Sequence, residues 1–161
     1  MPPYLRTALC PVASAAPRPG GPYLRPRADD GLALSLTVPC EPRSAAIARN
    51  AMTSALHAHG LDRYGPLATL AATELISTAA KLTTGDDLYL SLRHRDNALR
   101  LVVWDQHPHH ADPDAVTLCE QRRRRSLWLL AAVVDDWGGE WGIGDARPPH
   151  YGTKSWVVLP W

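Results

Sequence analysis

The chain has 161 residues, of which 45% are hydrophobic and 20% are charged, and its formal net charge is +1. This size and composition are typical of one globular domain with its own core, and the near-neutral charge argues against nucleic acid or an anionic membrane as the main partner. The longest apolar run, residues 127–134, is too short to span a membrane, and the N-terminus lacks the pattern of a signal peptide, so we expect a cytoplasmic protein.

The first thirty residues differ in composition from the rest. They contain seven prolines and a Gly-Gly pair. Because proline fixes φ and removes an amide donor, we expect residues 1–30 to form a flexible arm rather than a helix or a central strand. The folded domain is expected over residues 31–161.

The first half of that domain is expected to contain a strand and two helices. Leucine and valine alternate with small residues over 32–38, which predicts a strand with one buried face that ends at Pro39. A helix is expected over residues 41–60, and the residues expected on its buried side are Ile47, Ala51, Ala55 and Ala58. Pro66 suits the first turn of a second helix that ends near Leu82.

The second half is expected to contain a hairpin, a loop, a helix and two strands. Apolar residues alternate over 86–94 and 98–105, and the Arg-Asp-Asn sequence between these runs is typical of a turn. The prolines and polar residues of 106–115 predict a loop. Ser126 is expected to cap a helix that continues to Trp137. Two short strands are then expected, at residues 138–143 and 155–161.

This order of elements favours one fold class. The strands occur together rather than alternating with helices, which favours an α/β (α+β) two-layer sandwich over a doubly wound parallel sheet. We expect a mixed, mostly antiparallel sheet covered by helices on one face.

Four segments carry a resemblance to a known family: ELISTA at 74–79, LRLVVWDQHP at 99–108, SLWLLAAVVDDWG at 126–138 and GTKSWVVLP at 152–160. Their order and spacing resemble the RsbW-type branch of the GHKL (histidine kinase-like) ATPase superfamily. The resemblance implies a Bergerat-type ATP-binding fold with ATP and Mg²⁺ as cofactors. It also implies the function of that branch, which includes anti-sigma factors that are serine/threonine kinases.

The resemblance assigns roles to three side chains in the first two segments. Glu74 matches the general base toward the hydroxyl that is phosphorylated. Thr78 occupies the position of a Mg²⁺-ligating asparagine, and its shorter side chain is a poorer match for the metal. Asp105 matches the aspartate that accepts a hydrogen bond from the adenine amino group. Both carboxylates are expected to open into one cleft between the helices and the sheet.

The phosphate-binding segments depart further from the family. Arg124 and Ser126 stand where the family has glycines, with Arg125 between them, and glycine is used there because a Cβ would crowd the phosphate. Arginine side chains can also bind phosphate oxygens. The closing segment that borders the pocket is matched by Gly152, Thr153 and Lys154. The resemblance therefore implies an eroded nucleotide site with weak or lost kinase activity.

Other interpretations of the same residues stay open. Without the resemblance, Glu74 and Thr78 form the edge of a helix in contact with solvent. The arginines at 122–125 form either an anion-binding patch or a solvated loop in an arginine-rich protein. Trp128 is either packed in the core or exposed as an anchor for a partner.

The histidine-rich loop after residue 105 offers ligands for a metal ion. The candidate ligands are His107, His109 and His110, near Asp105 and Asp112. Neighbouring residues in a proline-broken loop seldom converge on one ion without ligands from elsewhere. The three cysteines have no CxxC spacing, so we expect reduced thiols rather than a disulfide framework or a zinc site; they are Cys10, Cys40 and Cys119.

Three functions follow from these patterns. The first is a regulatory protein that keeps the ATP-binding fold, binds a sigma factor or an anti-anti-sigma protein, and has little or no turnover. The alternative is an active ATP-dependent serine/threonine kinase of an anti-anti-sigma protein. The third is a nucleic-acid binder through the arginine run, which the balanced charge disfavours. The family resemblance also allows a homodimer.

Overall fold

The fold is described from a computed structural model, which describes residues 31–85, 87–146 and 151–161. The arm expected over residues 1–30, including Cys10, lies outside the described residues. The elements in chain order are β1 (Ala33–Pro39), α1 (Ser44–Ala58), the short 3₁₀ helix η2 (Asp62–Tyr64), α2 (Gly65–Leu82), β2 (Asp87–Arg95), β3 (Ala98–Asp105), α3 (Pro113–Ser126), α4 (Trp128–Asp136), β4 (Glu140–Asp145) and β5 (Thr153–Pro160).

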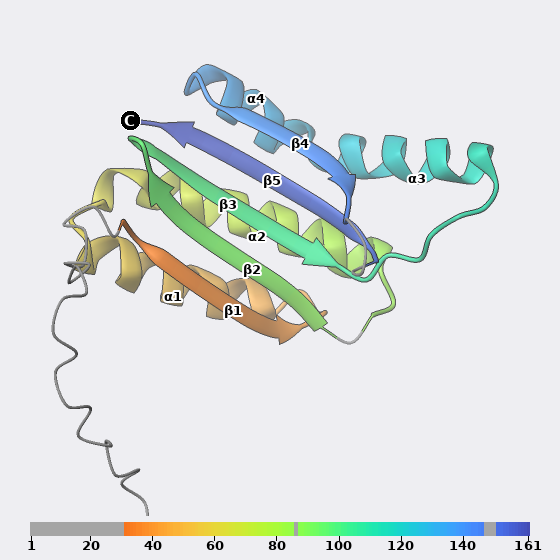
Figure 1. The fold of residues 1–161 in the computed structure, drawn as a ribbon, viewed down its shortest axis with the longest axis horizontal. Helices are drawn as coiled ribbons and strands as arrows, with labels where there is room; N and C mark the ends of the chain where they lie inside the picture. The colour runs from red at the N-terminus through yellow and green to blue at the C-terminus, as the bar shows by residue number, and fades with distance from the viewer. Residues whose placement is uncertain (1–30, 86, 147–150) are drawn as a thin grey trace, which may run out of the picture.

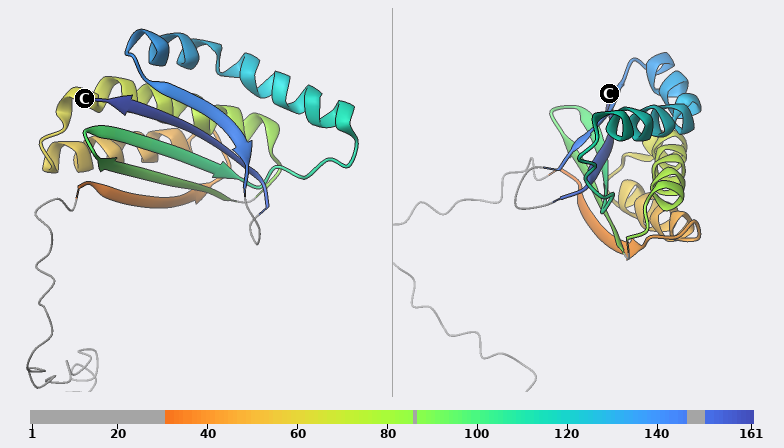
Figure 2. Two further views of the ribbon diagram at one scale, coloured as in Figure 1. Left: turned by 45° about the horizontal axis from the view of Figure 1, so that its top comes forward. Right: turned by 90° about the vertical axis from the view of Figure 1, so that its right-hand side faces the viewer.

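The strands form one sheet in the order β1-β2-β3-β5-β4. Each described pairing is antiparallel, including the pairings that β5 makes with β3 and β4. The helices cover one face of this sheet, as Figures 1 and 2 show. The expected α+β two-layer sandwich is therefore confirmed, with a sheet that is antiparallel throughout its described pairings rather than mixed.

The hairpin between β2 and β3 follows directly from its turn residues. Asp96 and Asn97 have φ values of 50° and 56°. Two consecutive residues with positive φ are typical of the two-residue turns whose twist matches that of the strands, and Asp and Asn tolerate this conformation well. In the antiparallel register of this hairpin, Arg95 lies opposite Ala98 at the turn, and Trp104 lies opposite Tyr89 at the far end.

The core lies between the sheet and α2. Alternate residues of β2, β3 and β5 are buried, as the period-2 pattern of a strand requires. Helix α2 contacts α1, α3, α4 and strands β3 and β5, and small side chains let its backbone approach these neighbours closely. Its buried residues are Leu67, Ala68, Ala71, Ala72, Leu75, Ile76, Thr78 and Ala79.

The buried side of α1 differs from the expected one. The Ile47 residue is 52% exposed, so the prediction that it lies on the buried side of α1 is wrong. The side that faces the core carries Met52 and Leu56 instead, together with Ser44, Ala45 and Ala48. The observed side buries two long side chains together with two alanines, which removes more apolar area from water than one isoleucine and three alanines would.

Helix α3 occupies a segment that was partly expected to be a loop. It begins at Pro113, and the Asp112 carboxylate caps it by accepting a hydrogen bond from the Asp114 amide at 3.1 Å. Ser126 is the last residue of α3, and no side-chain hydrogen bond caps α4, so the cap expected at Ser126 is wrong. In α3 only Arg123 is buried, which explains why the helix shows no apolar periodicity in the sequence.

Among the described residues, no helix combines the length and the apolar character that crossing a membrane requires.

Candidate functional site

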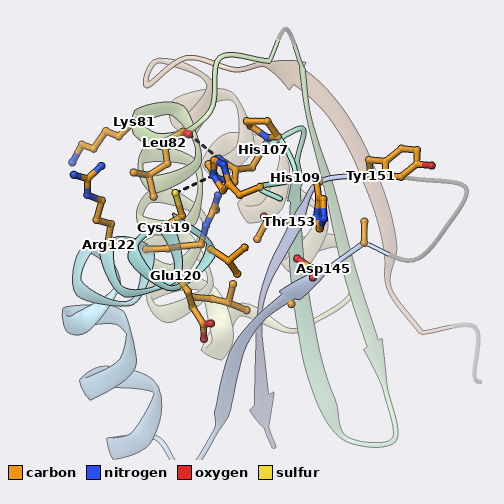
Figure 3. A pocket seen from close by; sticks show the side chains of 18 residues that line it. Lys81, Leu82, His107, His109, Cys119, Glu120, Arg122, Asp145, Tyr151 and Thr153 are labelled. Carbon is orange, nitrogen blue, oxygen red and sulfur yellow. Dashed lines mark hydrogen bonds between the residues drawn. The ribbon is translucent and has the colours of Figure 1, made fainter. Parts of the chain in front are cut away.

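A cavity of about 580 Å³ opens at one end of the sandwich. Its walls come from the end of α2, the loop after β3, helix α3 and the ends of β4 and β5 (Figure 3). The cavity contains basic side chains from α2 and α3, three histidines from the loop, and Gly152 and Thr153 at the start of β5. Of the residues expected to form a nucleotide site, only Gly152 and Thr153 line this cavity.

The Asp105 carboxylate is buried and fully engaged by donors of the chain itself. The side chain is 0% exposed. Its Oδ2 accepts a hydrogen bond from Arg123 Nη1 at 2.7 Å. Its Oδ1 accepts bonds from Thr83 Oγ1 at 2.9 Å, the His107 amide at 3.0 Å and Arg123 Nη2 at 3.3 Å. The prediction that Asp105 opens into a cleft is therefore wrong, because both oxygens face internal donors.

Arg123 is the ion-pair partner of Asp105 and holds α3 against the sheet. Its side chain is 4% exposed, and its Nη1 also lies 3.4 Å from Ser155 Oγ on β5. The guanidinium fork suits a two-point contact with a carboxylate. The sequence analysis included Arg123 only as part of the run 122–125 and gave it no role of its own, because nothing within a run of four arginines marks the buried member.

Glu74 and Thr78 lie on α2 and are not among the residues that line this cavity. Thr78 is only 2% exposed and Glu74 is half-buried. Mg²⁺ in proteins usually keeps several water ligands, which a buried threonine hydroxyl cannot accommodate. Together with the engaged Asp105, this means that the residues present do not fit Mg²⁺-ATP in the manner that the resemblance implies.

The remaining residues expected to bind phosphate lie on the surface. Arg124 pairs with Glu120 at 2.9 Å in an exposed i, i+4 contact, and Arg125 and Ser126 are also exposed. All three lie in the last turn of α3, where unpaired groups are carbonyls rather than the amides that cradle phosphate. Lys154 is exposed on β5. With Arg123 buried and Arg124 paired, the arginine run is not one basic surface.

Gly152 brings the start of β5 close to the end of β3. Its φ is +119°, and a Cβ at this position would lie 2.0 Å from the backbone oxygen of Asp105. In the β3–β5 register, Thr153 lies opposite Asp105. A glycine is therefore required here by both conformation and space.

The loop after β3 and helix α3 bring together His107, His110 and Cys119. One ligand atom from each lies within 4.8 Å of the others, so these three side chains could hold a metal ion. His109 lines the same cavity but is not part of this group, and Asp112 caps α3 instead. Sequence reasoning identified both histidines as candidate ligands but missed Cys119, which supplies the ligand from another element.

The two described cysteines, Cys40 and Cys119, are not joined in a disulfide, and their surroundings differ. Burial raises the pKa of the Cys40 thiol, and the nearby Asp105 carboxylate raises this pKa further. The Cys40 thiol lies 3.9 Å from the Thr83 carbonyl oxygen, to which it donates. Because the thiolate is the reactive and metal-binding form, Cys40 is poorly suited to either role.

Comparison of the chain with models of known protein families finds no match, and comparison with curated proteins finds none either. The protein is therefore described by its fold and its site alone. It is an α+β sandwich with a buried ion pair between Asp105 and Arg123 at the end of β3, and histidines line part of the adjoining cavity.

Proposed function

We propose that this protein is a regulatory protein-binding module, built on a sandwich that resembles the GHKL ATP-binding fold but with a closed nucleotide site. Its partner is a sigma factor or an anti-anti-sigma protein, the two classes that the RsbW-type resemblance implies. The observation that carries this proposal is the buried ion pair between Arg123 and Asp105.

The ion pair between Arg123 and Asp105 makes adenine binding at Asp105 energetically unfavourable. An adenine amino group could reach the Asp105 carboxylate only by displacing Arg123 or another internal donor. Breaking a buried ion pair by removing one partner costs about 3–5 kcal/mol. That cost corresponds to a dissociation constant weaker by about two to three and a half decades.

The phosphate side of the site supports the loss of turnover. The glycines that would expose backbone amides are replaced by Arg124 and Ser126, which lie within a helix, and Thr78 is buried. A single electrostatic contact to a transition state is typically worth about 3 kcal/mol. Losing two such contacts lowers a rate by about four decades.

Trp128 gives the module an exposed anchor for a partner. It is the first residue of α4, its side chain is 67% exposed, and the neighbouring Leu129 is 40% exposed. Arg125 precedes it by three residues in the chain and is exposed as well. Tryptophan and arginine are both enriched at interface hot spots, and the Arg125 guanidinium favours an acidic partner.

Replacing Trp128 by alanine is expected to weaken partner capture by about 30-fold or more, because a hot-spot side chain contributes about 2 kcal/mol or more to binding. The melting temperature is expected to stay unchanged, because most of the side chain contacts solvent. Ile47→Ala is the matched control, since Ile47 is an exposed apolar residue on a different helix. Equal losses of capture and melting temperature in Trp128→Ala would instead indicate a packing role.

The proposed function is tested by titrating the full chain against sigma factors and anti-anti-sigma proteins of its own genome, with and without millimolar Mg²⁺-ATP. We expect a complex with one of these classes, with the same affinity in both conditions. Transfer of phosphate to a serine or threonine of the partner would overturn the proposal in favour of an active kinase. Absence of a complex with either class would overturn the proposed partner.

A further inference from the structure

We propose that His107, His110 and Cys119 form a zinc site on the wall of the cavity. His110 Nε2 lies 3.1 Å from His107 Nε2 and 3.1 Å from Cys119 Sγ. The three side chains are half-buried and come from the loop after β3 and from α3. This inference needs neither a nucleotide nor a protein partner, so it is independent of the proposed function.

Two of the three distances between these atoms are close to those of a zinc ligand set. Zinc binds histidine nitrogen at about 2.0–2.1 Å and cysteine sulfur at about 2.3 Å, mostly in tetrahedral geometry. Two nitrogens bound in this way are about 3.3 Å apart, and a nitrogen and a sulfur are about 3.6 Å apart. The distances of 3.1 Å therefore need to open by only a few tenths of an ångström to admit the ion.

The backbone of α2 prepares His107 for metal binding. His107 Nδ1 lies 2.9 Å from the carbonyl oxygen of Leu82. A carbonyl only accepts hydrogen bonds, so Nδ1 carries the proton, and Nε2 of the neutral ring presents its lone pair toward His110. Metal-ligating histidines commonly have this second contact, which fixes the tautomer and the ring orientation. Figure 3 shows His107 between Leu82 and the cavity.

The same geometry disfavours a nucleophilic cysteine–histidine pair. In such a pair, cysteine contacts one ring nitrogen of the base, and an orienting group contacts the other nitrogen. Here, Cys119 and His107 both contact Nε2 of His110. A neutral Nε2 has either one proton or one lone pair, so it cannot form a good hydrogen bond with both neighbours. A cation between the three atoms accepts one lone pair from each of them.

The ligand set and its surroundings indicate zinc with one open position. Imidazole and thiolate ligands suit zinc, and zinc sites with three protein ligands keep a water molecule in the fourth position. The cavity provides room for that water. Lys81 and Arg122 also line the cavity, and in Figure 3 their charged ends point away from Cys119.

The site is tested by titrating the full-length, metal-free chain with Zn²⁺ in competition with a chromophoric chelator. We expect one equivalent to bind, and His110→Ala and Cys119→Ser each to weaken binding by more than about 100-fold, since even second-shell partners of a ligand are worth 10–100-fold. The matched controls are His109→Ala, from the same loop and cavity, and Cys40→Ser, the other described thiol; both are expected to bind as the unmodified chain does.

Cobalt provides a second readout that does not depend on affinity alone. Co²⁺ bound to the unmodified chain and to Cys40→Ser should show thiolate-to-metal charge-transfer absorption, and Cys119→Ser should lack it while keeping the circular dichroism of the folded chain. Less than one equivalent of zinc bound by the unmodified chain would overturn the proposal. So would an equal loss in His109→Ala and His110→Ala, or thiolate absorption that persists in Cys119→Ser.

Discussion

Replacing Arg123 by methionine is expected to lower the free energy of unfolding by about 3–5 kcal/mol. Methionine keeps much of the length of the side chain but leaves the 0% exposed Asp105 carboxylate without its counter-charge. Thr83 and the His107 amide still donate to Asp105, but neither carries a charge. Chemical denaturation, with the slope checked for a two-state transition, measures this loss.

The adjacent arginine supplies the control. Arg124 pairs with Glu120 on the surface of the same helix, so Arg124→Met is expected to cost only about 0.3–0.5 kcal/mol. Adding Asp105→Asn to Arg123→Met should recover a large part of the loss, because the uncompensated buried charge is removed. Similar small losses in the two single arginine variants would contradict the assignment of Arg123 as the buried partner.

Replacing Gly152 by alanine is expected to destabilise the fold by more than about 1–3 kcal/mol. That range is the cost of a strained backbone conformation alone, and the φ of Gly152 is +119°. In addition, the new Cβ would lie 2.0 Å from the Asp105 carbonyl oxygen, so β5 would have to move away from β3. The loss is measured by chemical denaturation, as for Arg123.

Two other glycines separate the contributions of strain and of steric contact. Gly60 has a φ of +66° with open space around it, so Gly60→Ala should show the cost of strain alone, about 1–2 kcal/mol. Gly144 has neither a positive φ nor a close neighbour, and Gly144→Ala should change stability by less than about 0.5 kcal/mol. A loss in Gly152→Ala no larger than that in Gly60→Ala would show that β5 tolerates the displacement.

Local signals in the sequence were sufficient for most of the fold. Alternating leucines predicted β2 and β3, Asp96 and Asn97 predicted their turn, and Pro66 predicted the start of α2. Each of these signals acts over a few residues, through backbone conformation or side-chain period. Helix α3 was missed because it buries one arginine rather than an apolar stripe, so only its cap at Asp112 marks its start.

The candidate site was less accessible to sequence reasoning, since its contacts join distant segments. Asp105 was recognised as a fixed group at the end of a strand, but its pairing with Arg123 depends on how α3 packs against the sheet. Similarly, His107 and His110 were recognised as ligand candidates, whereas the approach of Cys119 depends on a helix that was not expected. Nothing within a local window selects one arginine or one cysteine for these contacts.

The most direct test of the closed nucleotide site is a calorimetric titration of the full chain with Mg²⁺-ATP and with ADP. Because Asp105 is engaged by Arg123, we predict no binding heat at millimolar nucleotide. Micromolar binding that Asp105→Asn abolishes, in a variant shown to remain folded, would contradict this prediction and would show that the ion pair opens to admit adenine.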